Sequence, residues 1–213
     1  ETILLAILID DSGSIRFAGN SQAIRDGHNM IVESLKKSKQ ADSIFVHTRY
    51  LNGKTLYPFK PISQVEMLTP QNYDPNGGTP LYDESSVILA TSIAKVQEFA
   101  NNGIVSRAIT LIMTDGADQG STRLRRPEEL NPVITDMLKS EAHIVAALGV
   151  EEPGTNFTAV FQAMGIPLQW ILTPKNNESE IRKAFAVFSQ SALRASQGVG
   201  GFTQQALGGF ASP

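Results

Sequence analysis

Two kinds of apolar pattern alternate along the chain. Residues 2–9 and 106–114 are almost continuously apolar, which is typical of strands that are buried on both faces of a parallel sheet. Between them, apolar residues recur at helical spacing, as at Ile24, Ile31 and Leu35. Strands that alternate with helices are joined by βαβ crossovers. The chain is therefore predicted to be an α/β protein with a doubly wound, mostly parallel sheet and helices on both faces.

Turn and capping residues place the remaining elements. Asn52 and Gly53 readily adopt the positive φ angles of a tight turn between two β-rich runs, so we expect an antiparallel hairpin at the edge of the sheet. One helix is expected to begin after Thr79, with Pro80 in its first turn. Further helices are expected near residues 21–39, 128–140, 157–164 and 178–195, and further strands over 143–150 and 168–173.

The length of the chain limits the number of domains. With 213 residues, 41% of them hydrophobic, the chain can bury one sizeable core and is too short for two. We expect one domain over residues 1–197. Residues 198–213 form a glycine-rich tail with the composition of a flexible segment.

Charge and cysteine content exclude several classes of function. The net charge of -3 and a pI near 5.6 give no general attraction to nucleic acid or to anionic membranes. The chain has no cysteine, which excludes disulfides, thiolate metal ligands and a cysteine nucleophile. The opening apolar run is too short to span a bilayer and lacks the flanks of a secretory signal. We therefore expect a cytoplasmic bacterial protein without a membrane span, and a surface or secreted role stays open.

Acidic and hydroxyl residues follow two predicted strands at the points where the strands end. Asp10, Ser12 and Ser14 come directly after the first strand, and Asp115 follows the strand that begins near residue 106. In an open parallel sheet, ligands bind beyond the carboxyl ends of the strands, where neighbouring loops diverge. Thr79, after a Gly-Gly turn, adds a third hydroxyl. Such hard oxygen ligands are the set expected around Mg²⁺, with Mn²⁺ or Ca²⁺ as alternatives.

Two carboxylates and three hydroxyls do not satisfy a divalent ion fully. Mg²⁺ prefers about six oxygen ligands and keeps some waters, so at least one position of the ion stays replaceable. A carboxylate from a partner protein fits that position.

At these residues the sequence resembles a known family. The stretches "DDSGSI", "GGTPLYD" and "TDG", in this order, are similar to the metal-ion-dependent adhesion site of von Willebrand factor A (VWA) domains. The resemblance covers nearly the whole chain and implies the Rossmann-like VWA fold. It implies that Ser12, Ser14 and Thr79 contact the metal directly, and that Asp10 and Asp115 largely hold its waters. Among VWA proteins, the chain looks most like stand-alone bacterial members, including those associated with tellurite resistance.

A polar loop follows the last of these motifs. The stretch "ADQGSTRLRRPEEL" carries Arg123, Arg125 and Arg126, and many members of the family continue more directly into the next helix. The loop is expected at the rim of the metal face. The three arginines are a candidate contact for an acidic partner, and the alternative is an ordinary solvated loop.

Several other residues are expected to have structural roles only. Asp11 is expected to point away from the ligand set and to bond to nearby backbone. Asp83 is expected to support the start of its helix, where negative charge is favoured. Three dispersed histidines and the lone tryptophan are expected to be structural: His28, His47, His143 and Trp170.

Three classes of function remain after this reading. The first is a metal-dependent protein interaction module, not an enzyme, that binds an acidic residue of a partner through a Mg²⁺ site. The second is a metal-dependent phosphohydrolase with Asp10 as nucleophile, although the three motifs contain no acid-base histidine and no phosphate-binding lysine. The third is a scaffold that associates through the edge hairpin or the tail. The oligomeric state stays open.

Overall fold

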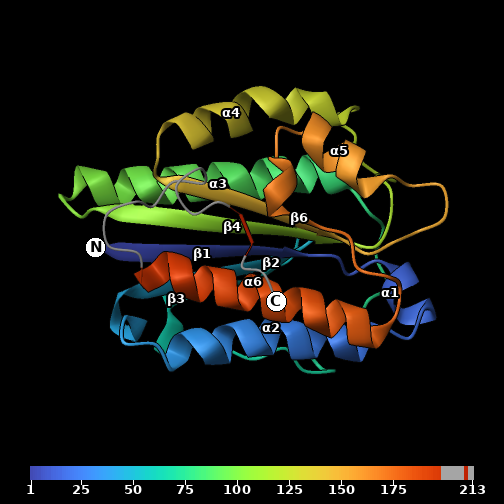
Figure 1. Cartoon of the computed structure of the whole chain (residues 1–213), viewed down its shortest axis with the longest axis horizontal. Coiled ribbons are helices and arrows are strands. Elements are labelled where there is room, and N and C mark those ends of the chain that lie inside the picture. Colours follow the sequence, from blue (N-terminus) through green and yellow to red (C-terminus); the bar gives the residue numbers. More distant parts are fainter. Residues whose placement is uncertain (198–208, 211–213) are drawn as a thin grey trace.

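A six-stranded mixed sheet forms the centre of the molecule (Figure 1). The structure is a computed structural model that describes residues 1–197 and 209–210. The strand order is β3-β2-β1-β4-β5-β6; β2 and β3 are antiparallel, and the other neighbouring pairs are parallel. The strands are β1 (Thr2–Ile9), β2 (Ile44–Tyr50), β3 (Thr55–Pro61), β4 (Ser106–Thr114), β5 (His143–Gly149) and β6 (Ile171–Leu172).

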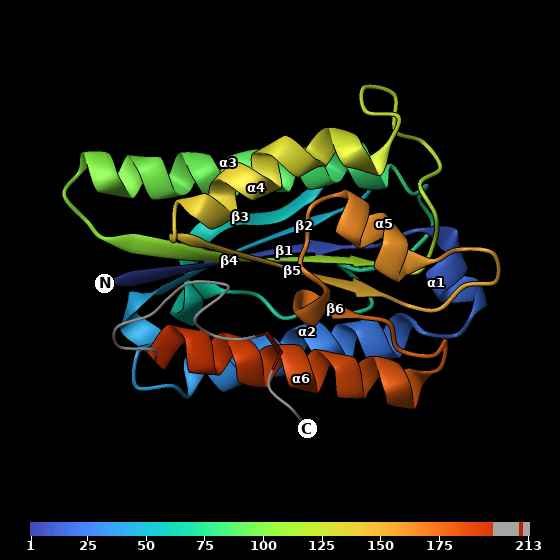
Figure 2. The ribbon, with the colours of Figure 1, turned by 45° about the horizontal axis from the view of Figure 1, so that its top comes forward.

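Helices cover both faces of this sheet, as the sequence predicts. Figure 2 shows α3, α4 and α5 on one face, and α2 and α6 side by side on the other. The helices are α1 (Gly13–Phe17), α2 (Ser21–Lys36), α3 (Leu81–Asn101), α4 (Asn131–Lys139), α5 (Phe157–Ala163) and α6 (Glu178–Gln197). None of the helices in the described part of the chain is long and apolar enough to cross a membrane.

The core lies between the central strands and these two helical layers. Residues 4–9 of β1 have no solvent exposure, because helices cover both faces of the strand. On the lower face in Figure 2, α2 and α6 approach closely at Gly27: a Cβ atom at this position would lie 2.2 Å from the ring of Phe185. The continuously apolar pattern of the central strands therefore predicts their burial correctly.

The predicted edge hairpin is present. Tyr50 N–H donates to the carbonyl of Lys54 at 2.9 Å, and Gly53 between them has a φ of +88°. The edge strand β3 contains Pro58 and Pro61, which have no backbone N–H to offer to a further strand. The hairpin thus closes one edge of the sheet.

The boundaries of α3 differ from the prediction. The helix begins at Leu81, with Pro80 as its N-cap and not in its first turn. Thr79 forms an isolated bridge with Gln119, whose N–H donates to the carbonyl of Thr79 at 2.8 Å. This bridge keeps Thr79 extended and delays the helix.

Two further elements differ from the sequence analysis. Gly13–Phe17 form the short helix α1, for which no prediction was made. The strand predicted over 168–173 is reduced to Ile171–Leu172, because Leu168–Trp170 form a 3₁₀ turn.

The order in which strands are added to the sheet reverses between the parallel strands β1 and β4. The connection after β1 leads through α1 and α2 to β2 on one side, whereas the connection after β4 leads to β5 on the other side. The loops at the carboxyl ends of β1 and β4 therefore leave in opposite directions, which opens a crevice between them. The predicted metal ligands follow these two strands.

Most of the predicted glycine-rich tail, 198–208 and 211–213, lies outside the described residues. The two described residues, Gly209 and Phe210, contact the domain itself. Phe210 N–H donates to the carbonyl of Gln169 at 3.0 Å, and its ring lies 5.3 Å from that of Trp170 between ring centroids.

Candidate metal centre

Asp10 joins the ends of the two central strands. Its carboxylate is fully buried, and Oδ1 accepts the N–H of Ser12 at 2.7 Å. Oδ2 accepts the hydroxyl of Thr114 at 2.7 Å and the N–H of Asp115 at 3.1 Å. Because both oxygens already accept hydrogen bonds from the protein, Asp10 fixes the loop after β1 against the loop after β4.

Three oxygens converge beside Asp10, on Ser12, Ser14 and Asp115. Ser14 Oγ lies 2.8 Å from Ser12 Oγ and donates to Asp115 Oδ1 at 2.6 Å. Ser12 Oγ lies 3.3 Å from the same carboxylate oxygen. We refer to these three atoms as the oxygen triangle. Ser14 is exposed, so the triangle faces solvent on one side.

Thr79 is placed next to this triangle by the loop before α3. Gly13 N–H donates to the carbonyl of Gly77 at 3.1 Å, which holds the two loops together. A Cβ atom on Gly116, directly after Asp115, would lie 3.7 Å from Thr79 Oγ1. Within the described part of the chain, the hydroxyl of Thr79 makes no hydrogen bond. The structure therefore brings together all five predicted ligands, and the hydroxyl oxygen of Thr79 remains available to bind a metal ion.

The two carboxylates of the site carry uncompensated charge. Burial and the negative charge of Asp10 raise the pKa of Asp115 to about 6, against the opposing hydrogen bonds from Ser14 and Ser12. Neither Asp10 nor Asp115 forms an ion pair with any residue that the structure describes. At neutral pH, two buried negative charges thus lie close together, a situation that a bound cation relieves.

The dimensions of the oxygen triangle suit a small octahedral ion. Mg²⁺ binds oxygens at about 2.1 Å, so two adjacent ligands of an octahedron are about 3.0 Å apart. The two triangle atoms expected to contact the metal, Ser12 Oγ and Ser14 Oγ, are 2.8 Å apart, which is close to this value. The described residues contain no group of three or more His, Cys, Asp or Glu placed to hold a metal ion. A metal at this site would therefore depend on hydroxyl oxygens, which makes it a sparse site for a hard cation.

Asp11 has a different partner from its neighbours. Its Oδ1 accepts the N–H of Asn52 in the hairpin turn at 3.0 Å, which confirms the predicted bond to backbone. Its carbonyl accepts the N–H groups of Asn76 and Gly77 at 2.8 and 2.9 Å. Burial raises the pKa of Asp11 to about 6. Asp11 therefore connects the first loop to the hairpin and to the segment that carries Thr79.

Asp83 lies in the first turn of α3, where negative charge is favoured as predicted, but its hydrogen bonds go to another segment. Its carboxylate accepts N–H groups from Thr122, Arg123 and Leu124 at 2.8 to 3.2 Å, so it holds the polar loop after β4. The start of α3 is capped by Asp118, whose Oδ1 accepts the N–H of Tyr82 at 3.1 Å. The sequence pattern could not separate these roles, because both acids lie close to the same helix end.

The three arginines of that loop are exposed. Arg123 Nε lies 3.8 Å from Asp83 Oδ2, and the N–H groups of Arg125 and Arg126 donate to Glu129 at 2.7 and 2.8 Å. The backbone of the loop is thus fixed, whereas the guanidinium groups are accessible. Their role in contacting a partner stays a prediction.

The remaining residues singled out in the sequence are buried. His28, His47, His143 and Trp170 are at most 5% exposed. Burial lowers the pKa of each of these histidines to about 4, so they are neutral at pH 7. The structural interpretation of these side chains agrees with their burial.

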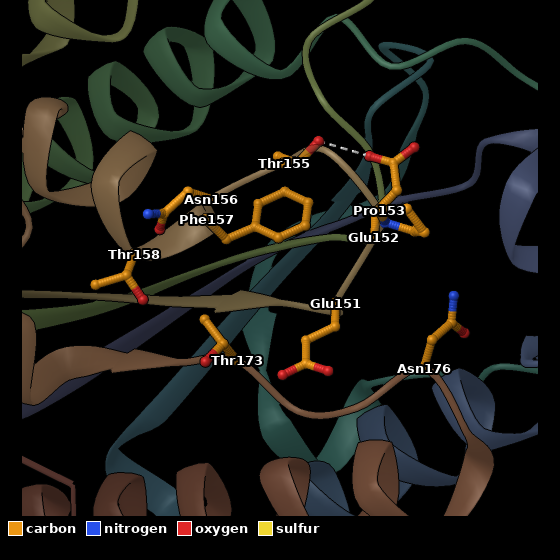
Figure 3. Close-up of a pocket in the computed structure, with 9 residues that line it drawn as sticks. All are labelled: Glu151, Glu152, Pro153, Thr155, Asn156, Phe157, Thr158, Thr173 and Asn176. Carbon is orange, nitrogen blue, oxygen red and sulfur yellow. Dashed lines mark hydrogen bonds between the residues drawn. The ribbon is translucent and has the colours of Figure 1, made fainter.

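A cavity of about 620 Å³ lies beside the metal centre, at the ends of β5 and β6 (Figure 3). Glu151 and Glu152 line it, and the sequence analysis did not single them out. The signal that could have found them is the same one that marks Asp10 and Asp115, because both glutamates follow closely on a buried strand.

Comparison with known proteins supports the fold alone. No protein-family model and no curated protein matches the chain. Among solved structures, the von Willebrand factor domain of the type V pili tip protein Mfa5 from Porphyromonas gingivalis has a TM-score of 0.60 at 10% identity, covering 93% of this chain and 97% of that one.

Two other solved structures are longer. A von Willebrand factor type A protein from Catenulispora acidiphila has a TM-score of 0.55 at 14% identity, covering 91% of this chain and 43% of that one. Proximal thread matrix protein 1 from the mussel byssus has a TM-score of 0.54 at 18% identity, covering 87% and 46%. This chain therefore spans less than half the length of both proteins. The strand order, the crevice and these likenesses together show that the chain has the Rossmann-like fold of von Willebrand factor A domains.

Proposed function

We propose that the chain is a Mg²⁺-dependent protein interaction module that binds an acidic side chain of a partner. The observation that carries this proposal is the oxygen triangle beside Asp10, in the crevice between two diverging loops. In it, Ser12 Oγ and Ser14 Oγ are separated by about the edge length of a magnesium octahedron. Two of the structural neighbours carry names that describe a pilus tip protein and a thread matrix protein. These names describe structural roles and no reaction, which supports a binding role here.

The residues of the site would have different roles in holding the ion. The hydroxyls of Ser12, Ser14 and Thr79 are the candidates for direct contact, and Asp115 adds negative charge at the triangle. Asp10 acts as an anchor, because both of its oxygens accept hydrogen bonds from the protein. A bound Mg²⁺ supplies positive charge and a coordination position open to a carboxylate; Mn²⁺ and Ca²⁺ are alternatives.

An exposed aromatic side chain supports a protein partner at this site. Phe17, at the end of α1, is 87% exposed, and its ring lies 3.5 Å from the position of a Cβ on Gly13 in the metal loop. Aromatic residues are enriched at the energetic centres of interfaces. Phe17 thus offers an apolar contact next to the charged one.

The geometry favours binding over phosphate hydrolysis. Asp10, the nucleophile of the hydrolase hypothesis, is fully buried, and hydrogen bonds to both oxygens hold it away from a substrate in solvent. Association through the edge hairpin is disfavoured by the two prolines of β3. The bacterial, cytoplasmic setting and the tellurite-resistance type stay predictions.

Calorimetric titration of Mg²⁺ and Mn²⁺ into the metal-stripped full chain tests this proposal. We expect weak binding that tightens when acetate is present at constant ionic strength, because ion and carboxylate share a coupling free energy. Binding should be lost in Ser12→Ala/Ser14→Ala. The matched control is Ser34→Ala/Ser38→Ala, which removes two hydroxyls near the carboxyl end of α2. Equal binding by both double variants, or no binding with or without acetate, would overturn the proposal.

A further inference from the structure

The cavity in Figure 3 lies between the loop after β5 and the loop after β6. Its volume of about 620 Å³ falls within the range of typical ligand pockets. Figure 3 shows the side chain of Glu151 on the side of Thr173 and Asn176, and Glu152 on the opposite side near Thr155. The lining residues are Glu151, Glu152, Pro153, Thr155, Asn156, Phe157, Thr158, Thr173 and Asn176.

Two hydrogen bonds fix the lining of this cavity to neighbouring segments, and one of them leads to the loop of the metal centre. Glu152 Oε2 accepts the N–H of Ala117, two residues after Asp115, at 3.2 Å. On the other side, Asn176 Oδ1 accepts the side-chain N–H of Asn20, which precedes α2, at 2.5 Å. Glu152 and Asp115 thus belong to loops that are in direct contact, which places the cavity next to the metal centre.

The lining of the cavity carries only negative charge. Glu152 is held by Ala117 and by the hydroxyl of Thr155, which donates at 2.9 Å. Glu151 is exposed, and its carboxylate has no hydrogen bond or ion pair with any residue in the described ranges. Lys175 belongs to the loop after β6, but it is not among the residues that line the cavity. A cationic group is therefore the complement that the cavity lacks.

We infer that the cavity receives a lysine or arginine side chain from the same partner segment whose acidic residue reaches the metal centre. This inference rests on the proposed function and specifies the partner further. The long side chain of a basic residue can lie along Phe157 and the threonines while its charged end meets Glu151. The two glutamates also repel segments that are acidic throughout, so they separate a mixed-charge partner from a uniformly acidic one.

Selection from a displayed library of short peptides tests this inference. Each peptide carries one fixed aspartate between randomised positions, and selection uses the full wild-type chain in saturating Mg²⁺. We expect Lys and Arg to be enriched about tenfold over the unselected library at one fixed spacing from the aspartate. The enrichment should disappear for Glu151→Gln and persist for Glu98→Gln, which makes the same charge change near the far end of α3.

The outcomes separate this inference from the proposed function. If peptides bind in a Mg²⁺-dependent manner without basic enrichment, or if Glu151→Gln keeps the enrichment, the inference is wrong and the proposed function stands. If a second library with asparagine in place of the aspartate binds equally well, or if removal of Mg²⁺ with EDTA changes nothing, the proposed function itself fails.

Discussion

Asp115 and Asp83 are two buried carboxylates at the same end of the molecule, and their surroundings differ in one respect. Asp83 accepts three backbone N–H groups from residues 122–124. Burial alone would raise its pKa, but the N–H groups of this segment outweigh burial and lower it. Asp115 receives only hydroxyl donors and lies beside Asp10, so its pKa is raised to about 6.

The type of hydrogen-bond donor determines whether an aspartate stabilises the fold or is available to bind a ligand. Backbone N–H groups are fixed donors that cannot leave, so Asp83 is permanently satisfied. Hydroxyl groups both donate and accept, and they can turn their lone pairs toward a cation. Ser12 and Ser14 can therefore switch from donating to Asp115 to sharing an ion with it. A carboxylate that lacks fixed donors is the one available to a ligand.

The largest effect on stability is expected from Asp83→Ala. The change leaves the N–H groups of residues 122–124 without their acceptor, and the free energy of unfolding should fall by about 2–4 kcal/mol. Urea denaturation measures this value. Mg²⁺ affinity, measured on the folded variant, should change less than about threefold. A larger loss of affinity would break the distinction between the two carboxylates.

A smaller effect of opposite sign is expected from Asp115→Asn in the absence of metal. The amide is neutral and still accepts hydrogen bonds from the serines, so the variant should gain about 1–2 kcal/mol in free energy of unfolding at pH 7. The same variant should lose the additional stability that Mg²⁺ gives to the wild type. Denaturation with EDTA and with Mg²⁺ provides both values. Destabilisation of the metal-free variant would contradict the account.

The two effects should also depend on pH in different ways. Because the pKa of Asp115 is raised in the folded protein, its ionised form costs stability above pH 6, and that cost disappears as the pH falls toward 4. The gain from Asp115→Asn should therefore shrink over this range. Because the pKa of Asp83 is lowered, its contribution persists above about pH 4 and is lost only below it. If the free energy of unfolding of Asp83→Asn and of Asp115→Asn changes with pH in the same way, the type of hydrogen-bond donor does not determine the pKa of these carboxylates.

The smallest effect is expected from Arg123→Gln. Its side chain is 65% exposed, with Nε 3.8 Å from Asp83 Oδ2, and exposed pairs of this kind contribute less than about 1 kcal/mol. The free energy of unfolding should change by less than about 0.5 kcal/mol. A clearly larger loss would mean that Asp83 depends on this ion pair and not on the backbone N–H groups.

Much of the fold follows from the sequence pattern, because burial on both faces makes most residues of β1 and β4 apolar. The hairpin follows from Asn52 and Gly53. The start of α3 lies one residue later than predicted, because the bridge between Thr79 and Gln119 joins loops that are distant in sequence. Local propensity carries no information on such a contact.

In the candidate site, too, some features follow from the sequence and others depend on contacts between distant loops. The grouping of Asp10, Ser12, Ser14 and Asp115 follows from topology alone, since the carboxyl ends of neighbouring parallel strands meet at one edge. The partner of Asp83 does not follow, because its donors are backbone N–H groups, which every residue of the loop offers alike.

Anomalous diffraction from crystals grown with Mn²⁺ tests the central claim most directly. The account predicts one strong anomalous peak within bonding distance of Ser12 Oγ and Ser14 Oγ, beside Asp115. It also predicts that the peak is absent in Ser12→Ala/Ser14→Ala crystals grown under the same conditions. A peak held only by Glu151 and Glu152, or no peak at the oxygen triangle of the wild type, would contradict it.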